Sequence, residues 1–299
     1  MPTFNMGIRE LQLGGQYLGA LRDSTDLKGD FDAIRGRFDE DGYVLIRKFH
    51  DPAKVLNARR ALLDSLDNAG QIDRRFALDE GVIAEGGRGS FAGGAQAAAR
   101  IPSYLEVVES PDVLEFFANF LQGPAITFDF KWLRAVATGG FTGSHYDVVY
   151  MGRGTLNLFT LWTPLGRTTY DMGTLAILEG SHCSERLEKL RATYGKMDVD
   201  RDNIEGWFSN DPIEVVEKFG GRWLTTEFEP SDAIFFGMFT LHGSLNNSTN
   251  RYRISCDTRY QRADEPADER WVGENPKGHY AWNKSPALPM EKAREKWGV

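Results

Sequence analysis

The chain has 299 residues, with 35 Lys and Arg against 43 Asp and Glu, so its formal net charge is −8. Hydrophobic residues make up 41% of the chain, which suffices for a globular core and excludes a disordered, collagen-like or coiled-coil protein. The acidic balance argues against a sequence-independent nucleic-acid binder, because such a protein needs a basic face to neutralise phosphates.

The cysteine content and the apolar segments predict where the protein resides. Cys183 and Cys256 cannot form a disulfide framework, and no CxxC motif is present. We expect both to be reduced thiols in a cytoplasmic protein. The N-terminus lacks a basic stretch followed by an apolar run, which predicts no signal peptide, and the apolar run at 233–239 is too short to cross a bilayer. We therefore expect no membrane partner; the oligomeric state stays open.

The N-terminal region, residues 1–123, is predicted to be mostly helical. Apolar residues at helical spacing predict helices over 31–41, 52–69 and 111–121, and a proline at the start of the last two suits a first helical turn. Residues 43–46 (YVLI) predict a short buried strand.

From about residue 124 the sequence changes to short β-rich segments separated by Gly, Pro, Asp or Asn. These segments predict a mainly β protein with a closed or double-sheet architecture, such as a jelly roll. Residues 183–219 are charged and partly helical, so we expect an insertion there. The β core would then span 124–262 of a single domain, followed by a C-terminal extension, 263–299, that ends in a short helix. The predicted strands cover residues 125–136, 145–151, 156–162, 174–178, 222–228, 232–237, 240–245 and 251–260.

His145 and Asp147 form an HxD motif in one predicted strand. Residues two apart on a strand point to the same face, so the imidazole and the carboxylate can bind one ion. The motif alone is common by chance, and by itself it is better explained by a core histidine beside a surface aspartate. His242, at the mouth of a later strand, would complete a set of two histidines and one carboxylate, which leaves three positions open on an octahedral ferrous ion.

Three other histidines are present. His182, in the sequence LEGSH, is the chief rival of His242 as the distal ligand, although its position after a Gly-Ser turn suits a loop residue. His50 and His279 lie outside the strand block, and we expect them to be surface or packing residues.

Arg253 lies eleven residues after His242, on the strand expected to follow it. A guanidinium presents a rigid fork to a carboxylate, which suits the distal carboxylate of 2-oxoglutarate. Arg251 and Arg259 remain alternatives, because all three would share a face of an unbulged strand. Arg153, in a Gly-Arg-Gly turn, could meet an anionic substrate or simply occupy a hairpin turn.

Several segments resemble the phytanoyl-CoA dioxygenase family of non-haem Fe(II)/2-oxoglutarate-dependent oxygenases. In chain order they are FDEDGYVLIRKF, GSHYD, LWTPL, DMGTLAILEGSH, DAIFF and LHGS followed by Arg253. The resemblance covers roughly residues 31–262 and implies a double-stranded β-helix, a cupin-like barrel with flanking helices. It implies His145, Asp147 and His242 as iron ligands and Arg253 as the residue that binds 2-oxoglutarate. Other positions implied to contact the co-substrate or line its pocket are Ser244, Trp162, Lys131 and Trp132.

The resemblance also implies the reaction. Such an oxygenase uses Fe(II), 2-oxoglutarate and O2 to hydroxylate or otherwise oxidise a C–H bond of a small organic metabolite, with release of succinate and CO2. Related halogenases have a small residue at the position of Asp147, so hydroxylation is favoured over halogenation. Two alternatives stay open: a cupin-like metal-dependent hydrolase or isomerase, since the same ligands can activate water, and a non-catalytic ligand-binding barrel.

Overall fold

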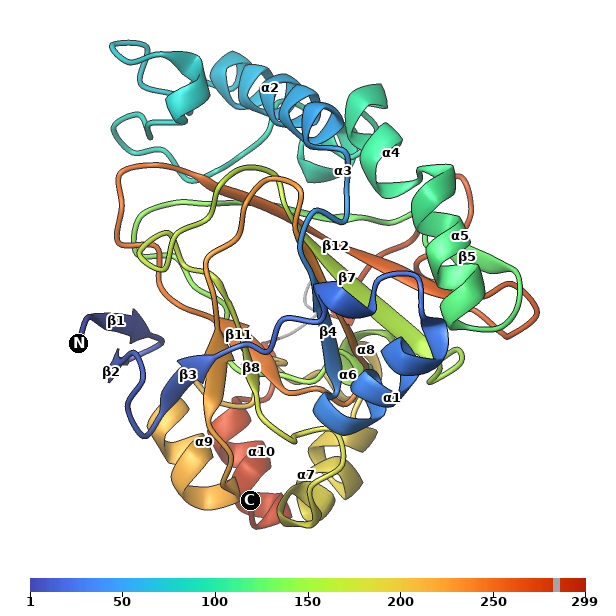
Figure 1. The fold of residues 1–299 in the computed structure, drawn as a ribbon. Helices are drawn as coiled ribbons and strands as arrows, with labels where there is room; N and C mark the ends of the chain where they lie inside the picture. Colours follow the sequence, from blue (N-terminus) through green and yellow to red (C-terminus); the bar gives the residue numbers. More distant parts are fainter. Residues whose placement is uncertain (282–285) are drawn as a thin grey trace.

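Two β-sheets face each other in the computed structural model, which describes residues 1–281 and 286–299 (Figure 1). In spatial order the larger sheet contains β4 (Tyr43–Ile46), β10 (Ala233–Gly237), β7 (Leu158–Pro164), β12 (Arg253–Arg262) and β5 (Ala125–Thr127), and β6 (Trp132–Val136) also pairs with β12. The smaller sheet contains β11 (His242–Ser244), β8 (Leu175–Leu178), β9 (Trp223–Thr225) and β3 (Leu18–Ala20).

The inner faces of the two sheets share one apolar layer. Both sheets contribute fully buried side chains to it, namely Tyr43, Leu45, Trp162, Leu175, Ile177, Leu224, Ile234 and Phe236. Burial of alternate residues from both sheets holds them face to face. The arrangement confirms the predicted double-stranded β-helix with flanking helices, although within the described residues the two sheets do not close into one continuous barrel.

Helices cover the outer face of the larger sheet. α1 (Phe31–Asp41), α2 (Pro52–Asn68), α4 (Pro102–Val108) and α5 (Pro111–Phe120) pack their apolar sides against β4, β10 and β12 (Figure 1). Three of these helices begin with a capping side chain that accepts a hydrogen bond from a backbone N–H of the first turn. The capping residue is Asp30 in α1, Asp51 in α2 and Ser110 in α5. The three N-terminal helices predicted from the sequence are confirmed.

A second set of helices covers the outer face of the smaller sheet. The segment between β8 and β9 contains α7 (Glu188–Ala192), α8 (Val199–Asp202) and α9 (Pro212–Phe219), as the charged, partly helical insertion predicted. The predicted C-terminal helix, α10 (Met290–Trp297), packs into the same apolar cluster as α9.

Two features differ from the sequence prediction. The region before α1 is not only helical, because β1 (Thr3–Met6) and β2 (Arg9–Gln12) form a hairpin and β3 joins the smaller sheet. The predicted strand 145–151 is wrong: His145 makes a single β-bridge with His242, and the chain then turns into the short helix α6 (Val148–Met151). The β-branched residues of that segment are buried as helical side chains instead.

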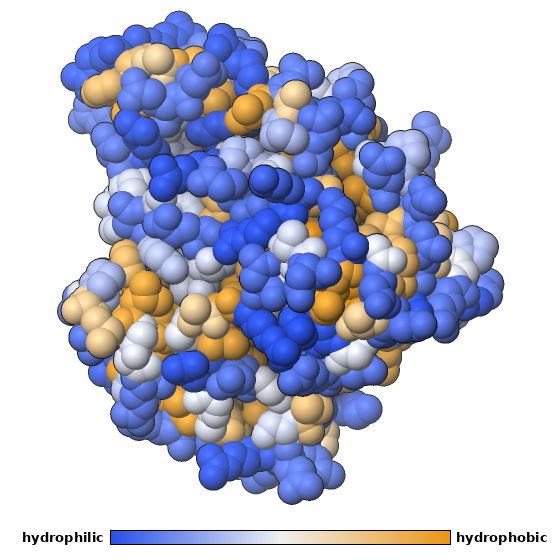
Figure 2. Space-filling view, viewed as in Figure 1, coloured by the Kyte–Doolittle hydropathy of each residue, from blue (hydrophilic) through white to orange (hydrophobic). Residues whose placement is uncertain are grey.

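The face of the molecule seen in Figure 2 is mostly hydrophilic, with apolar side chains in separate groups. Among the described residues, every helix is too short or too polar to reach across a lipid bilayer.

Candidate active site

His145, Asp147 and His242 meet between the two sheets. His145 and His242 face each other in an antiparallel bridge, in which each backbone N–H donates to the other residue's carbonyl at 2.9 and 3.1 Å. Asp147 Oδ1 lies 3.7 Å from His145 Nε2 and 3.9 Å from His242 Nε2. The three side chains are buried, and their ligand atoms all lie within 4.8 Å of one another.

Backbone carbonyls fix the orientation of both imidazoles. The Nδ1 of His145 lies 2.9 Å from the carbonyl oxygen of Gly143, and that of His242 lies 3.0 Å from that of Thr240. A carbonyl can only accept, so each Nδ1 carries the proton and each Nε2 keeps a lone pair for a metal. Burial lowers the pKa of His145 to about 3 and also lowers the pKa of His242, so both rings are neutral.

Asp147 is ionised despite its burial. Desolvation alone would raise the pKa of its carboxyl group, but the charge of Arg259 and the hydrogen bond from Thr160 lower that pKa below its ordinary value. Thr160 donates its hydroxyl hydrogen to Oδ2, and Arg259 Nη2 lies 3.3 Å from the carboxylate. Two neutral imidazole nitrogens and one carboxylate oxygen, converging in a buried place, fit the donor set that Fe(II) takes in non-haem oxygenases.

Arg253 is a buried cation without a full set of partners. Its side chain is 2% exposed. Nη1 donates to Ser255 Oγ at 3.2 Å, whereas Nε and Nη2 have no hydrogen-bond partner among the described residues. Burial, with the nearby charge of Arg134, lowers the pKa of Arg253 to about 10. Because a buried guanidinium with unpaired N–H groups is costly, this site fits an added carboxylate.

The structure separates the three arginines that the sequence could not distinguish. Arg251 precedes β12 and pairs at the surface with Glu80 at 2.7 Å. Arg253 and Arg259 do share the inner face of β12, six residues apart, but Arg259 lies against Asp147. Arg253 therefore keeps the unpaired N–H groups that a distal carboxylate requires.

The structure places the other predicted co-substrate residues on different elements. Ser244 shares the face of His242 and accepts a hydrogen bond from the Thr142 N–H at 2.9 Å. Trp162 lies on the inner face of β7, where its ring packs 4.7 Å from that of Phe228. Lys131 points away from the site, because its Nζ pairs with Glu109 at 2.8 Å on the helical side of the sheet.

A cavity of about 660 Å³ opens beside His145 and Asp147. Trp132 lines this cavity, as predicted from the resemblance. The other lining residues come from β6 and the residue Phe130 before it, from Thr142 and α6, from β12, from the loop after α8, and from the C-terminal extension. They are Phe130, Arg134, Thr142, Tyr150, Met151, Glu205, Trp207, Arg259, His279 and Ala287. Of these, Arg259 and His279 were considered from the sequence, but for other roles.

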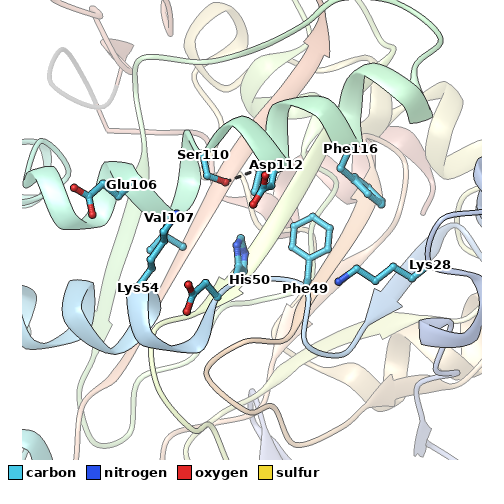
Figure 3. A pocket seen from close by; sticks show the side chains of 11 residues that line it. Lys28, Phe49, His50, Lys54, Glu106, Val107, Ser110, Asp112 and Phe116 are labelled. Carbon is cyan, nitrogen blue, oxygen red and sulfur yellow. Dashed lines mark hydrogen bonds between the residues drawn. The ribbon is translucent and has the colours of Figure 1, made fainter.

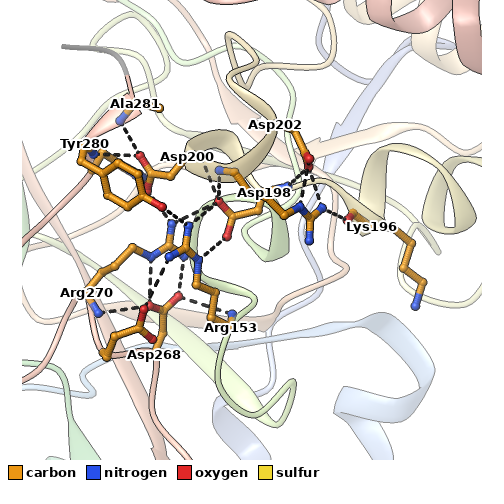
Figure 4. Close-up of polar contacts among 12 residues, drawn as sticks. Arg153, Lys196, Asp198, Asp200, Asp202, Asp268, Arg270, Tyr280 and Ala281 are labelled. Atoms are coloured by element: carbon orange, nitrogen blue, oxygen red, sulfur yellow. Dashed lines mark hydrogen bonds and ion pairs between the residues drawn. The ribbon is translucent and has the colours of Figure 1, made fainter. Parts of the chain in front are cut away.

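The C-terminal extension reaches the cavity through a buried ion cluster (Figure 4). Asp200, in α8, accepts hydrogen bonds from the backbone N–H groups of Tyr280 and Ala281 at 2.8 and 3.0 Å and pairs with His279 Nδ1 at 2.9 Å. The expectation that His279 is a surface or packing residue is therefore incomplete. Arg153 belongs to the same cluster, with Nε 2.7 Å from Asp198 Oδ2, so it points to that carboxylate and not into the cavity.

The two remaining histidines lie elsewhere. His182 Nε2 lies 3.0 Å from the carbonyl oxygen of Asp39. His50 is buried against Thr163, with 3.0 Å between Nε2 and Oγ1, in a separate cavity of about 270 Å³ between α2 and the α4–α5 helices (Figure 3). Neither joins the His145–Asp147–His242 cluster.

Comparison with known proteins finds oxygenase relatives. The chain is 27% identical over 255 residues to a 1-deoxypentalenic acid 11-beta-hydroxylase of Streptomyces exfoliatus, which covers 81% of this chain and 84% of the relative. A hydroxylase of the same name from Streptomyces arenae matches to the same extent.

Solved structures share the fold. One is the non-heme alpha-ketoglutarate-dependent carbocyclase SnoK from nogalamycin biosynthesis, with a TM-score of 0.57, 18% identity and coverage of 90% of this chain and 96% of that chain. Another is EctD from S. alaskensis with 2-oxoglutarate and 5-hydroxyectoine, with a TM-score of 0.54, 16% identity and coverage of 86% and 88%.

The family comparison agrees with the geometry. Residues 38–255 match the family model described as phytanoyl-CoA dioxygenase (PhyH), and this range contains the His145–Asp147–His242 cluster and Arg253. The chain belongs to the phytanoyl-CoA dioxygenase family.

Proposed function

We propose that the protein uses Fe(II), 2-oxoglutarate and O2 to hydroxylate, or otherwise oxidise, a C–H bond of a small organic molecule. The observation that carries this proposal is the buried cluster of two neutral histidines and one ionised aspartate beside a large cavity. Family membership and the hydroxylase relatives support the reaction class.

His145, Asp147 and His242 would hold the ferrous ion. Their Nε2 and carboxylate oxygens face one another, and the partners of each side chain keep it in the protonation state that a metal ligand needs. Three ligands on one face leave the other face to the keto acid and O2.

Arg253 would bind the distal carboxylate of 2-oxoglutarate. Its unpaired Nε and Nη2 supply the donors, and Ser244 offers a hydroxyl on the same side as His242. The burial of Arg253 strengthens a charge-assisted hydrogen bond, because little water competes for its N–H groups.

The iron and the co-substrate supply the oxidising power: one oxygen atom of O2 enters the substrate as a hydroxyl group, and the other enters succinate as 2-oxoglutarate loses CO2. The chain itself contributes position and exclusion of water. Thr160 and Arg259 hold the Asp147 carboxylate in one orientation, and the aromatic walls of the cavity keep the substrate against the metal ligands.

A turnover screen tests the function. The purified protein is incubated with Fe(II), 2-oxoglutarate and a metabolite library, and mass spectrometry follows products that gain one oxygen atom. We expect succinate and product in equal amounts and no product without O2. A substrate converted without consumption of O2 and 2-oxoglutarate would establish a metal-dependent hydrolase or isomerase instead.

Two further points belong to the proposal. The substrate is a small molecule, and the protein acts in the cytoplasm, which the two unbridged cysteines support. Residues 1–299 form one oxygenase domain, supported by the layers of helices that pack on both sheets.

A further inference from the structure

Arg259 is a second buried arginine, separate from the one assigned to 2-oxoglutarate. It lies on the inner face of β12 and is 2% exposed. Its Nη2 lies 3.3 Å from the Asp147 carboxylate, and its Nε contacts Met151 Sδ at 3.0 Å. Its guanidinium lies 4.6 Å from the ring centre of Trp132. The remaining nitrogen, Nη1, has no hydrogen-bond partner among the described residues, although Arg259 lines the 660 Å³ cavity.

The charges around the site indicate which kind of ligand Nη1 of Arg259 lacks. In the cavity, Arg134 is paired with Asp257 at 3.0 Å. Under the proposed function, Arg253 is neutralised by the distal carboxylate of 2-oxoglutarate, and the two charges of Fe(II) are neutralised by Asp147 and the keto-acid carboxylate. Glu205, the other carboxylate that lines the cavity, accepts a hydrogen bond from the backbone N–H of Met290. Among the described residues, Asp147 is the carboxylate paired with Arg259, and once Asp147 also neutralises the metal, Arg259 has no counter-charge of its own. A buried guanidinium in that position favours an anionic ligand.

The cavity around Arg259 is otherwise largely apolar and aromatic. Its walls include Phe130, Trp132, Tyr150, Met151 and Trp207. Such walls suit a hydrocarbon or aromatic skeleton, whereas a single buried guanidinium suits one acidic group and not a polyanion.

We propose that the substrate is an apolar organic acid whose carboxylate is bound by Nη1 of Arg259, with its skeleton against the aromatic wall formed with Trp132. This inference rests on the proposed function and extends it to a substrate class. Arg259 would thus contact the substrate with one nitrogen and position Asp147 with the other.

The test compares acids with neutral amides of the same shape. The probes are 1-naphthoic acid with 1-naphthamide, and decanoic acid with decanamide. Binding is measured by titration calorimetry on protein loaded with Ni(II) and 2-oxoglutarate, which cannot turn over. Arg259→Gln removes the charge and Arg259→Lys keeps it without the planar fork. Arg251→Gln is the control, because that arginine lies at the surface and pairs with Glu80.

We expect each acid to bind the wild type about tenfold more tightly than its amide, the gain of one charge-assisted hydrogen bond over a neutral one. Arg259→Gln should abolish this preference, Arg259→Lys should retain part of it, and Arg251→Gln should retain all of it. Arg251→Gln should leave the affinity for 2-oxoglutarate unchanged. Because Arg259 also holds Asp147, the Ni(II) affinity of each Arg259 variant is measured first, and acid is compared with amide only on protein saturated with Ni(II) and 2-oxoglutarate.

Several outcomes overturn the inference. Equal binding of acid and amide by the wild type, or a preference that survives in Arg259→Gln, shows that Arg259 does not bind the carboxylate. A loss of 2-oxoglutarate binding in Arg259→Gln while Ni(II) binding is unchanged would make this residue a co-substrate ligand. If Arg259→Gln does not fold, the wild-type ratio and Arg259→Lys still decide. Failure of the wild type to bind Ni(II) and 2-oxoglutarate would instead overturn the proposed function.

Discussion

At the scale of single residues, Asp147 and Arg253 are buried side chains of opposite charge that differ in their partners. Asp147 is neutralised within the chain, because Arg259 and Thr160 hold its carboxylate before any metal is bound. Arg253 has Ser255 Oγ as its one hydrogen-bond acceptor and no paired carboxylate among the described residues. The ionised Asp147 carboxylate is therefore suited to bind a cation, and the unpaired Arg253 guanidinium is suited to bind an anion.

Replacing Asp147 by Ala should abolish binding of the metal. It removes the one anionic ligand of the cluster and leaves Arg259 buried without a counter-charge, so the free energy of unfolding should also fall by about 3 kcal/mol. Calorimetric titration with Ni(II) and urea denaturation measure the two effects. The double variant Asp147→Asn with Arg259→Gln should regain part of the stability but none of the metal binding. Metal affinity that persists in Asp147→Ala would contradict the ligand assignment.

Replacing Arg253 by Met should have opposite effects on binding and on stability. The dissociation constant for 2-oxoglutarate should rise by at least about 30-fold, because a buried charge pair is lost. Without 2-oxoglutarate, the variant should be more stable than the wild type by about 1 kcal/mol, since it no longer buries an unpaired charge. Fluorescence titration and urea denaturation measure these changes. Arg251→Gln should alter neither the 2-oxoglutarate affinity nor the stability. An unchanged 2-oxoglutarate affinity in Arg253→Met would show that another residue binds the distal carboxylate.

At the scale of secondary-structure elements, β12 organises the site. Its inward residues alternate with outward ones that pack under α2, α4 and α5. The same rule explains why Lys131 and Trp132, adjacent on the chain, lie on opposite sides of the sheet. On the other side of the cavity, α8 holds the C-terminal extension through the carboxylate of Asp200.

The attachment of the C-terminal extension should weaken as the pH falls. Burial alone would raise the pKa of Asp200, but hydrogen bonds from Ala281, His279 and Tyr280 lower that pKa from the ordinary 3.8 to about 2. A depressed pKa stabilises the folded form fully above the ordinary value, and the contribution disappears as the pH falls towards 2. We expect the protection of the backbone amides in residues 268–281 against hydrogen exchange, relative to unprotected amides at the same pH, to decrease as the pH falls from about 4 to about 2.

The variant Asp200→Asn separates this effect from general acid unfolding. It should show fast exchange in residues 268–281 already at neutral pH and little further change between pH 4 and 2. Asp202→Asn is a matched control, because the Asp202 carboxylate on the same short helix pairs with Arg201. Equal exchange in Asp200→Asn and the wild type would show that other contacts hold the extension.

At the scale of the whole molecule, the proposed metal ligands connect the two sheets. Asp147 bonds to Thr160 of β7 in the larger sheet, whereas His242 belongs to β11 in the smaller one. Binding of Ni(II) and 2-oxoglutarate, each at about 100 times its dissociation constant, should stabilise the fold by at least about 2.7 kcal/mol. A raised melting temperature that returns to its starting value on chelation checks this. Asp147→Ala should show no such shift, and a shift retained in that variant would place the metal elsewhere.

The sequence predicted the parts of the protein that depend on local pattern. Helical periodicity predicted α1, α2 and α5, with a proline in the first turn of the last two, and short β-rich runs predicted most strands of the two sheets. The resemblance gave His145, Asp147 and His242 as one group. The sequence did not predict contacts that arise only from folding, such as Arg259 against Asp147 or His279 held by Asp200. It also missed α6, because the β-branched residues of Val148–Met151 favour a strand locally while packing fixes a helical turn.

The cavity draws its walls from two sources that are separate along the chain. His145, Asp147 and Arg259 lie on or beside the sheets, whereas Glu205, Trp207, His279 and Ala287 come from the segment between β8 and β9 and from the C-terminal extension. Changes in these two peripheral segments can reshape that part of the cavity without touching the proposed iron ligands. This part of the selectivity can therefore evolve separately from the reaction, and transplanting both segments together between homologues offers a route to new substrates.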